Sequence, residues 1–97
     1  MIRNIADRMT QDVYDGNSTR HARKRPAELH SKARRRLDQI NAVTRIETLG
    51  LPPGNRLEKL RGDLAGHWSV RINNQWRIVF RWEGVDAVDV KIVDYHR

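Results

Sequence analysis

The last third of the chain alternates apolar and polar residues in neighbouring segments, and this alternation limits the possible folds more than any other feature. Apolar side chains recur at every second position over residues 68–72 and again over residues 76–82. Such alternation puts the apolar residues on one face of a β-strand and the others on the opposite face. Only residues 73–75 separate the two segments, so they predict an antiparallel hairpin, and a third alternating segment at 88–92 extends it into a meander.

The register of this hairpin follows from the need to keep its apolar residues on one face. Opposed residues in an antiparallel pair share a face, so Ile72 is expected opposite Trp76 across a three-residue loop. The loop begins with Asn73, and asparagine tolerates the left-handed backbone that such loops need. The same register places Arg71 opposite Arg77 on the other face. Because opposed like charges are destabilising, we interpret this pair either as two arginines extended into water or as a clamp for a phosphate group.

The same reasoning extends to the third strand. A loop over residues 83–87 would place Arg81 opposite Asp89, as a surface ion pair of little energetic value. It would also place Arg77 opposite Val93.

The C-terminal residues continue from this strand. Tyr95 shares the parity of Val93 and is expected on the same face as Arg77, next to Asp94 and His96. An isolated histidine near a chain end is usually a surface residue. Beside a tyrosine and two arginines it is a candidate proton-transfer group, because imidazole gains and loses a proton near neutral pH.

The first half of the chain has helical periodicity instead. Leu29, Ala33, Leu37 and Ile40 recur at helical spacing and predict a helix from Ala27 to Ala42 or Val43, with Pro26 in its first turn. The remaining expected elements are a short strand over 1–5, a short helix or irregular segment over 6–14, a helical turn over 44–49, a stiff connector over 50–55 and a strand over 57–60. The predicted fold is α+β: a single domain over residues 1–97, with N-terminal helices packed on one face of a small, mainly antiparallel twisted sheet.

The charge distribution narrows the class of partner. The chain carries a net charge of +7 over 97 residues, which favours a polyanion such as nucleic acid, although the charge could also serve solubility or a protein partner. The segment from Arg20 to Arg36 is rich in Lys and Arg and contains one acid, Glu28. It is either a solvated helix face, a surface that follows RNA phosphates, or a docking face for an acidic partner. The chain has no cysteine and no apolar run of membrane-spanning length, so neither a thiolate metal site nor a membrane anchor is expected.

Three segments together resemble the HigB-type toxins of the RelE superfamily: residues 52–60, residues 66–78 and the Val-Asp-Tyr-His sequence at 93–96. The resemblance implies a RelE-like fold and a toxin of a bacterial type II toxin–antitoxin system. Its implied activity is a ribosome-dependent, metal-independent and cofactor-free endoribonuclease. This mRNA interferase would cleave messenger RNA through attack by the ribose 2′-hydroxyl, inhibiting translation and arresting growth. The implied partners are a HigA-like helix-turn-helix antitoxin, the ribosome with its messenger RNA in the cytoplasm, and operator DNA for the toxin–antitoxin complex alone.

The resemblance also implies roles for individual residues. Arg77 matches the arginine that stabilises the transition-state charge, and Asp94, Tyr95 and His96 match the catalytic cluster. We assign His96 as general acid or base, Tyr95 as a base or a stacking surface for RNA, and Asp94 as an orienting group. The candidate RNA- or phosphate-binding residues are Lys59, Arg61, Arg71 and Asn73.

One position departs from the family pattern. Some members carry a histidine before the hairpin, where this chain has Glu58 and Lys59. The second proton-transfer group is therefore open, with Lys59 or Tyr95 as substitutes. The codon preference and the antitoxin-binding face also stay open. The alternatives to a ribonuclease are a non-catalytic basic nucleic-acid-binding module and a scaffold that only binds its antitoxin.

Overall fold

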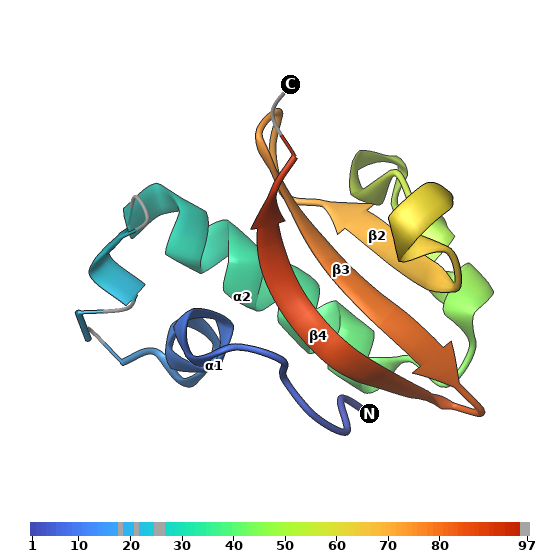
Figure 1. Ribbon diagram of the computed structural model, residues 1–97, viewed down its shortest axis with the longest axis horizontal. Coiled ribbons are helices and arrows are strands. Elements are labelled where there is room, and N and C mark those ends of the chain that lie inside the picture. The colour runs from blue at the N-terminus through green and yellow to red at the C-terminus, as the bar shows by residue number, and fades with distance from the viewer. Residues whose placement is uncertain (18, 21, 25–26, 96–97) are drawn as a thin grey trace.

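The computed structural model describes residues 1–17, 19–20, 22–24 and 27–95, and within them two α-helices cover one face of a four-stranded antiparallel sheet (Figure 1). The strands lie in the order in which they occur along the chain, which confirms the predicted α+β class. The helices are α1 (Arg8–Asp15) and α2 (Ala27–Ala42), and the strands are β1 (Glu58–Lys59), β2 (His67–Arg71), β3 (Trp76–Glu83) and β4 (Asp86–Asp94). Short 3-10 turns cover η1 (Ala22–Lys24), η2 (Ile46–Gly50), η3 (Pro53–Asn55) and η4 (Gly62–Leu64).

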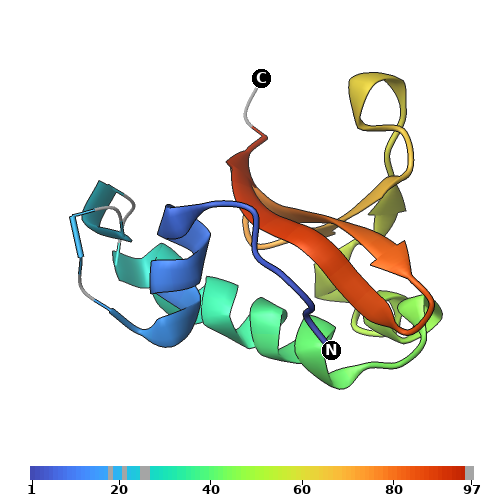
Figure 2. The same ribbon diagram turned by 60° about the horizontal axis from the view of Figure 1, so that its bottom comes forward.

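Helix α2 forms the layer beneath the sheet (Figure 2). Its four apolar stripe residues are buried, as the periodicity predicted, and they belong to the same core cluster as the inner-face residues of the strands. That inner face contributes Val70, Ile78, Phe80 and Val90, each fully buried. The predicted helix bounds are confirmed at Ala27 and Ala42, while Pro26 lies outside the described residues.

Helix α1 is short, and specific polar contacts define its ends. The Asp7 side chain accepts a hydrogen bond from the Thr10 backbone N–H at 2.8 Å, and Gly16 ends the helix in a left-handed conformation. The buried Thr10 hydroxyl in turn accepts a hydrogen bond from the Ile92 N–H at 2.9 Å, which ties α1 to β4. The strand expected over residues 1–5 forms only two isolated parallel bridges, which cover the outer edge of β4.

The hairpin of β2 and β3 has the predicted register. Arg71 lies opposite Arg77, and the Ile72 N–H donates to the Trp76 carbonyl at 2.9 Å. The Asn73 side-chain oxygen accepts from the backbone N–H groups of Gln75 and Trp76 at 2.9 and 2.8 Å. Asn73 therefore shapes the loop that sets this register.

The predicted register of β3 against β4 is right at one end and wrong at the other. Arg77 lies opposite Val93 as expected, but the loop predicted over residues 83–87 is wrong, because Glu83 pairs with Asp86 across a tighter turn. Arg81 consequently lies opposite Val88. A β-bulge restores the register, with Asp89 at a φ of 53°. The predicted Arg81–Asp89 ion pair still forms, at 2.6 Å.

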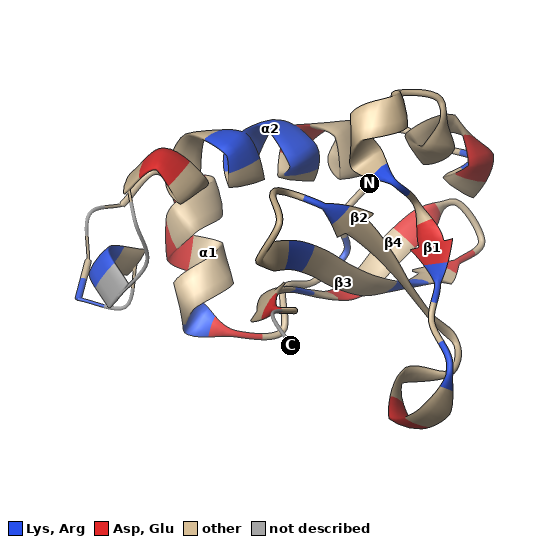
Figure 3. Cartoon of the chain, turned by 90° about the horizontal axis from the view of Figure 1, so that it is seen from above, with Lys and Arg blue, Asp and Glu red and all other residues tan. Residues whose placement is uncertain are grey.

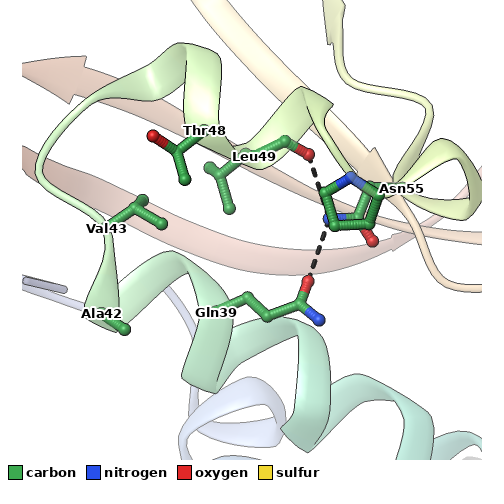
Figure 4. A pocket seen from close by; sticks show the side chains of 7 residues that line it. Gln39, Ala42, Val43, Thr48, Leu49 and Asn55 are labelled. Carbon is green, nitrogen blue, oxygen red and sulfur yellow. Dashed lines mark hydrogen bonds between the residues drawn. The ribbon is translucent and has the colours of Figure 1, made fainter.

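The connector between α2 and β1 and the end of α2 line a partly open pocket of about 220 Å³ (Figure 4). Asn55 is buried there and donates hydrogen bonds to the Gln39 side chain at 2.9 Å and to the Leu49 carbonyl at 3.0 Å. The lining residues are Gln39, Ala42, Val43, Thr48, Leu49, Pro52 and Asn55, none of which is a candidate site residue. No helix in the described ranges has both the length and the apolar character needed to cross a membrane.

Candidate active site

The candidate site lies on the open face of the sheet, at the end where the β2–β3 loop meets the C-terminal end of β4 (Figure 1). The Tyr95 N–H donates to the Gln75 carbonyl at 2.6 Å, and Asp94 lies opposite Trp76. The Gln75 side chain donates to the Asp94 carboxylate at 3.1 Å. These contacts bring Asp94 and Tyr95 to the hairpin loop. Tyr95 has the strand parity of the open face, as predicted, whereas Asp94 has the parity of Trp76 on the apolar face. His96 lies outside the described residues.

Arg77 is the central cation of the site. It does not extend into water, so the first of the two interpretations of the Arg71–Arg77 pair is wrong for Arg77. Only 7% of the residue is exposed. Its Nε donates to the buried Ser69 hydroxyl at 2.8 Å, and its Nη2 donates to the Arg56 backbone carbonyl at 2.7 Å. Both acceptors are uncharged, so they hold the guanidinium in place without neutralising it.

The electrostatics around Arg77 leave its positive charge largely uncompensated. Burial lowers the pKa of Arg77, while the Glu58 carboxylate and the Tyr95 ring oppose this shift, and Arg71 and Arg56 lower the pKa further. Glu58 lies 4.0 Å from Nη2, at the limit of an ion pair, and is itself half exposed. Because arginine stays protonated throughout the physiological range, the result is a fixed cation in a site of reduced solvation.

Tyr95 lies against Arg77. The guanidinium carbon is 5.4 Å from the centroid of the tyrosine ring, and the tyrosine is partly buried. This contact is a cation–π interaction, which orients the ring beside the charge. The phenol and the guanidinium are therefore close enough to act on one substrate group.

The other predicted site residues are divided between two places. Arg71 joins the site, and its side chain donates to Asn74 in the loop. Lys59 does not, because it pairs with Trp68 and its ammonium lies 5.7 Å from that ring on the opposite face of the sheet. Arg61 is exposed and follows β1. The neighbouring Leu60 bonds to His67, which begins β2, so Arg61 lies near the end of β2 that is far from the site.

Three residues of the site were not identified from the sequence: Arg56, Glu58 and Ser69. Ser69 shares strand parity with Arg71, and a serine at this polar position was a usable signal. Glu58 shares the open face only because β1 pairs Glu58 with Ser69, a register that hairpin spacing does not determine. Arg56 contributes a carbonyl, which no side-chain pattern reveals. Among the described residues, no group of three or more His, Asp or Glu side chains is placed to hold a metal ion.

Comparison with known proteins places the chain among toxins. Residues 3–96 match the family model described as "RelE-like toxin of type II toxin-antitoxin system HigB". The chain is 35% identical to Toxin HigB-1 of Vibrio cholerae, over 91% of this chain and 88% of that protein. It is 34% identical to Endoribonuclease HigB of Proteus vulgaris, over 73% of this chain and 76% of that protein.

A solved structure supports the fold. The chain superposes with a TM-score of 0.59 on a chain from the heterotetrameric YoeB–YefM toxin–antitoxin complex of Staphylococcus aureus. The two are 21% identical, and the match covers 97% of each chain. This likeness confirms the RelE-like arrangement of helices and sheet.

Proposed function

We propose that this chain, which belongs to the HigB family of RelE-like toxins of type II toxin–antitoxin systems, is an endoribonuclease that cleaves messenger RNA on the translating ribosome. The observation that carries this proposal is Arg77: a buried cation held by uncharged acceptors, opposite Arg71 and against Tyr95. A guanidinium held this way is suited to a phosphate whose negative charge increases during reaction.

The proposed reaction is an internal transfer at one RNA phosphate. The ribose 2′-oxygen loses its proton and bonds to the phosphorus, and the bond from phosphorus to the 5′-oxygen breaks. The leaving oxygen takes up a proton. The products are a 2′,3′-cyclic phosphate and a free 5′-hydroxyl. Arg77, assisted by Arg71, would stabilise the additional charge on the non-bridging oxygens.

The proton-transfer roles fall to the groups around this phosphate. The Glu58 carboxylate lies beside Arg77, so we assign Glu58 as the general base that accepts the 2′-hydroxyl proton. His96 would protonate the leaving oxygen, Asp94 would orient its neighbours, and Tyr95 would stack on an RNA base or assist as a base. Lys59 receives no proton-transfer role, because it lies on the other face.

The partners follow from the toxin–antitoxin system and from the reaction. As a toxin of such a system, the protein has an antitoxin partner. We propose that this antitoxin is a HigA-like helix-turn-helix protein and that the complex, rather than the toxin alone, binds operator DNA. The ribosome and its messenger RNA are the proposed targets, so the active toxin would work in the cytoplasm. We also propose that residues 1–97 form one toxin domain.

Primer extension on a translated message tests this function. Induced wild-type protein should create new 5′ ends within the message, and these ends should vanish when a mutated start codon prevents translation. The matched variants are Arg77→Gln and Arg81→Gln, which lie on the same strand and face. Cleavage should be lost only in the first. RNA binding without any new 5′ ends would instead favour the non-catalytic module, and antitoxin binding alone would favour the scaffold.

A further inference from the structure

A second arginine contact connects the helix layer to the candidate site. Arg36, on α2, donates from Nε to the backbone carbonyl of Arg71 at 3.1 Å. Arg71 is the last residue of β2, and its side chain lies opposite Arg77 on the open face. The contact therefore places a helical arginine directly beside the catalytic end of the sheet.

The path of the chain makes this contact possible. Strand β1 pairs with β2 at Trp68 and Ser69, and Leu60 continues this contact to His67, so these pairings leave the edge of β2 at Arg71 open to α2. Arg36 occupies this edge and also adjoins the connector, where its Nη2 is 3.7 Å from the position that a β-carbon on Gly54 would take. Arg36 is partly buried, which limits the solvation of its charge.

The neighbours of Arg36 are mainly cations. Burial lowers the pKa of Arg36, and the positive charges of Arg35 and Arg71 lower it further. Arg71 and Arg56 have the same effect on Arg77, so like charges from four segments of the chain converge here. Among the described ion pairs, the acid that reaches this group is Glu58, 4.0 Å from Arg77.

We propose that Arg36, together with Arg71, binds the RNA phosphate next to the one that is cleaved. The strand would then run from Arg77 over the end of β2 to α2. Figure 3 shows Lys and Arg positions on α2, at the end of β2 and at the start of β3 along this side of the molecule. The inference rests on the proposed function. If the scissile phosphate binds at Arg77, the neighbouring phosphates of the same strand lie close to these arginines.

An RNA strand fits this group better than a protein partner does. Arg71 lies opposite Arg77, and Arg36 contacts the Arg71 carbonyl, so these cations adjoin the reacting centre, and arginine forks match phosphate oxygens. Contacts of this kind position a strand without selecting its sequence. They would therefore raise affinity for every message equally.

The salt dependence of RNA binding tests the proposal. The probe is a short single-stranded RNA with 2′-O-methyl sugars, which lacks the attacking hydroxyl and therefore cannot be cleaved, and its binding is measured without the ribosome. Arg36→Gln should weaken binding about 10-fold, and the slope of log affinity against log salt should become shallower by about 0.7, the value for one phosphate contact on a single strand. Arg36→Lys should keep the slope, because the charge remains.

Arg34→Gln is the matched control on the same helix. Its guanidinium contacts the Val13 carbonyl toward α1, away from the site, so both affinity and slope should stay at wild-type values. Glutamine at position 36 can still donate to the Arg71 carbonyl, which favours retention of the fold. Equal slopes for Arg36→Gln and wild type, absence of RNA binding by the wild type, or loss of antitoxin binding alone would overturn the proposal. Because the probe is uncleavable, failure of the nuclease proposal would appear separately, as a wild type that binds this RNA but leaves translated messages intact.

Discussion

Strand β3 carries two arginines on the same open face, and their surroundings differ. The Arg81 side chain is 42% exposed and is paired with two carboxylates, Asp89 at 2.6 Å and Glu83 at 3.2 Å. The Arg77 side chain is 8% exposed and is held by a hydroxyl and a carbonyl, with the Glu58 carboxylate farther away at 4.0 Å. Hydrogen bonds and charge from the acids raise the pKa of Arg81, whereas burial lowers the pKa of Arg77. One arginine is neutralised locally, and the other keeps a charge that a substrate can use.

This difference separates a structural arginine from a functional one. A salt bridge at an exposed site contributes little to stability. Because its two charges compensate each other, it attracts a charged ligand only weakly. A buried cation with neutral acceptors is preorganised, so no reorganisation is needed when negative charge develops beside it. The following predictions test whether this distinction holds.

The largest effect is expected from removing the Arg77 charge. Arg77→Gln should lower the rate of messenger RNA cleavage about 100- to 1,000-fold, the usual loss when a donor to the reacting charge is removed. Arg81→Gln should change the rate less than about threefold, because Arg81 only takes part in a surface ion-pair network. Cleavage rates on translated messages measure both. Equal losses in the two variants would show that the distinction is wrong.

The next effect concerns the proposed base. Glu58→Gln keeps the size of the side chain but cannot accept the 2′-hydroxyl proton, so cleavage should slow about 100-fold. Glu47→Gln is the control, since Glu47 is 72% exposed and pairs only with Arg45 among the described ion pairs. If Lys59→Gln abolished cleavage while Glu58→Gln did not, the role would belong to Lys59.

A smaller effect is expected from the acceptor that holds Arg77. Ser69→Ala leaves Arg77 Nε without its partner, which should cost about 1–3 kcal/mol of stability and lower Tm by about 4–8 °C per kcal/mol. Cleavage should slow about tenfold, because a bond to a charged group positions the guanidinium. The exposed Ser31 on α2 offers the control, since Ser31→Ala removes a hydroxyl outside the site. Unchanged cleavage in Ser69→Ala would mean that Arg77 needs no positioning.

The smallest expected effect is on thermal stability. It concerns Asp89, the partner of Arg81, and depends on pH. Hydrogen bonds from Asn4 and Arg81 lower the pKa of Asp89, so its stabilising contribution is complete above the unfolded pKa, about 4, and is lost as pH falls through the lower folded pKa. Asp89→Asn should therefore reduce the drop in Tm between about pH 6 and about pH 3. Asparagine tolerates the positive φ at this position, and cleavage at neutral pH should persist. An identical drop in Tm in both proteins would contradict this account.

Periodicity alone predicted the parts of the fold that depend on residues close together in the sequence. The α2 stripe, the alternation of β3 and the opposition of Arg71 and Arg77 all follow from local spacing. The β-bulge was not predicted. The apolar pattern of β4 is compatible with the longer loop that we expected and also with the tighter turn observed, in which Asp89 adopts a left-handed conformation.

Away from the bulge at Asp89, which places Val88 opposite Arg81, the sequence by itself determined which residues share the open face, since side chains alternate along a strand. It thereby brought Arg71, Arg77 and Tyr95 to one side. Only the tertiary structure decided what surrounds them. The Arg56 carbonyl, the Glu58 carboxylate and the Arg36 guanidinium reach the site from segments whose approach depends on the path of the connector. No local period encodes such a path, because it results from how the connector, α2 and the sheet pack together.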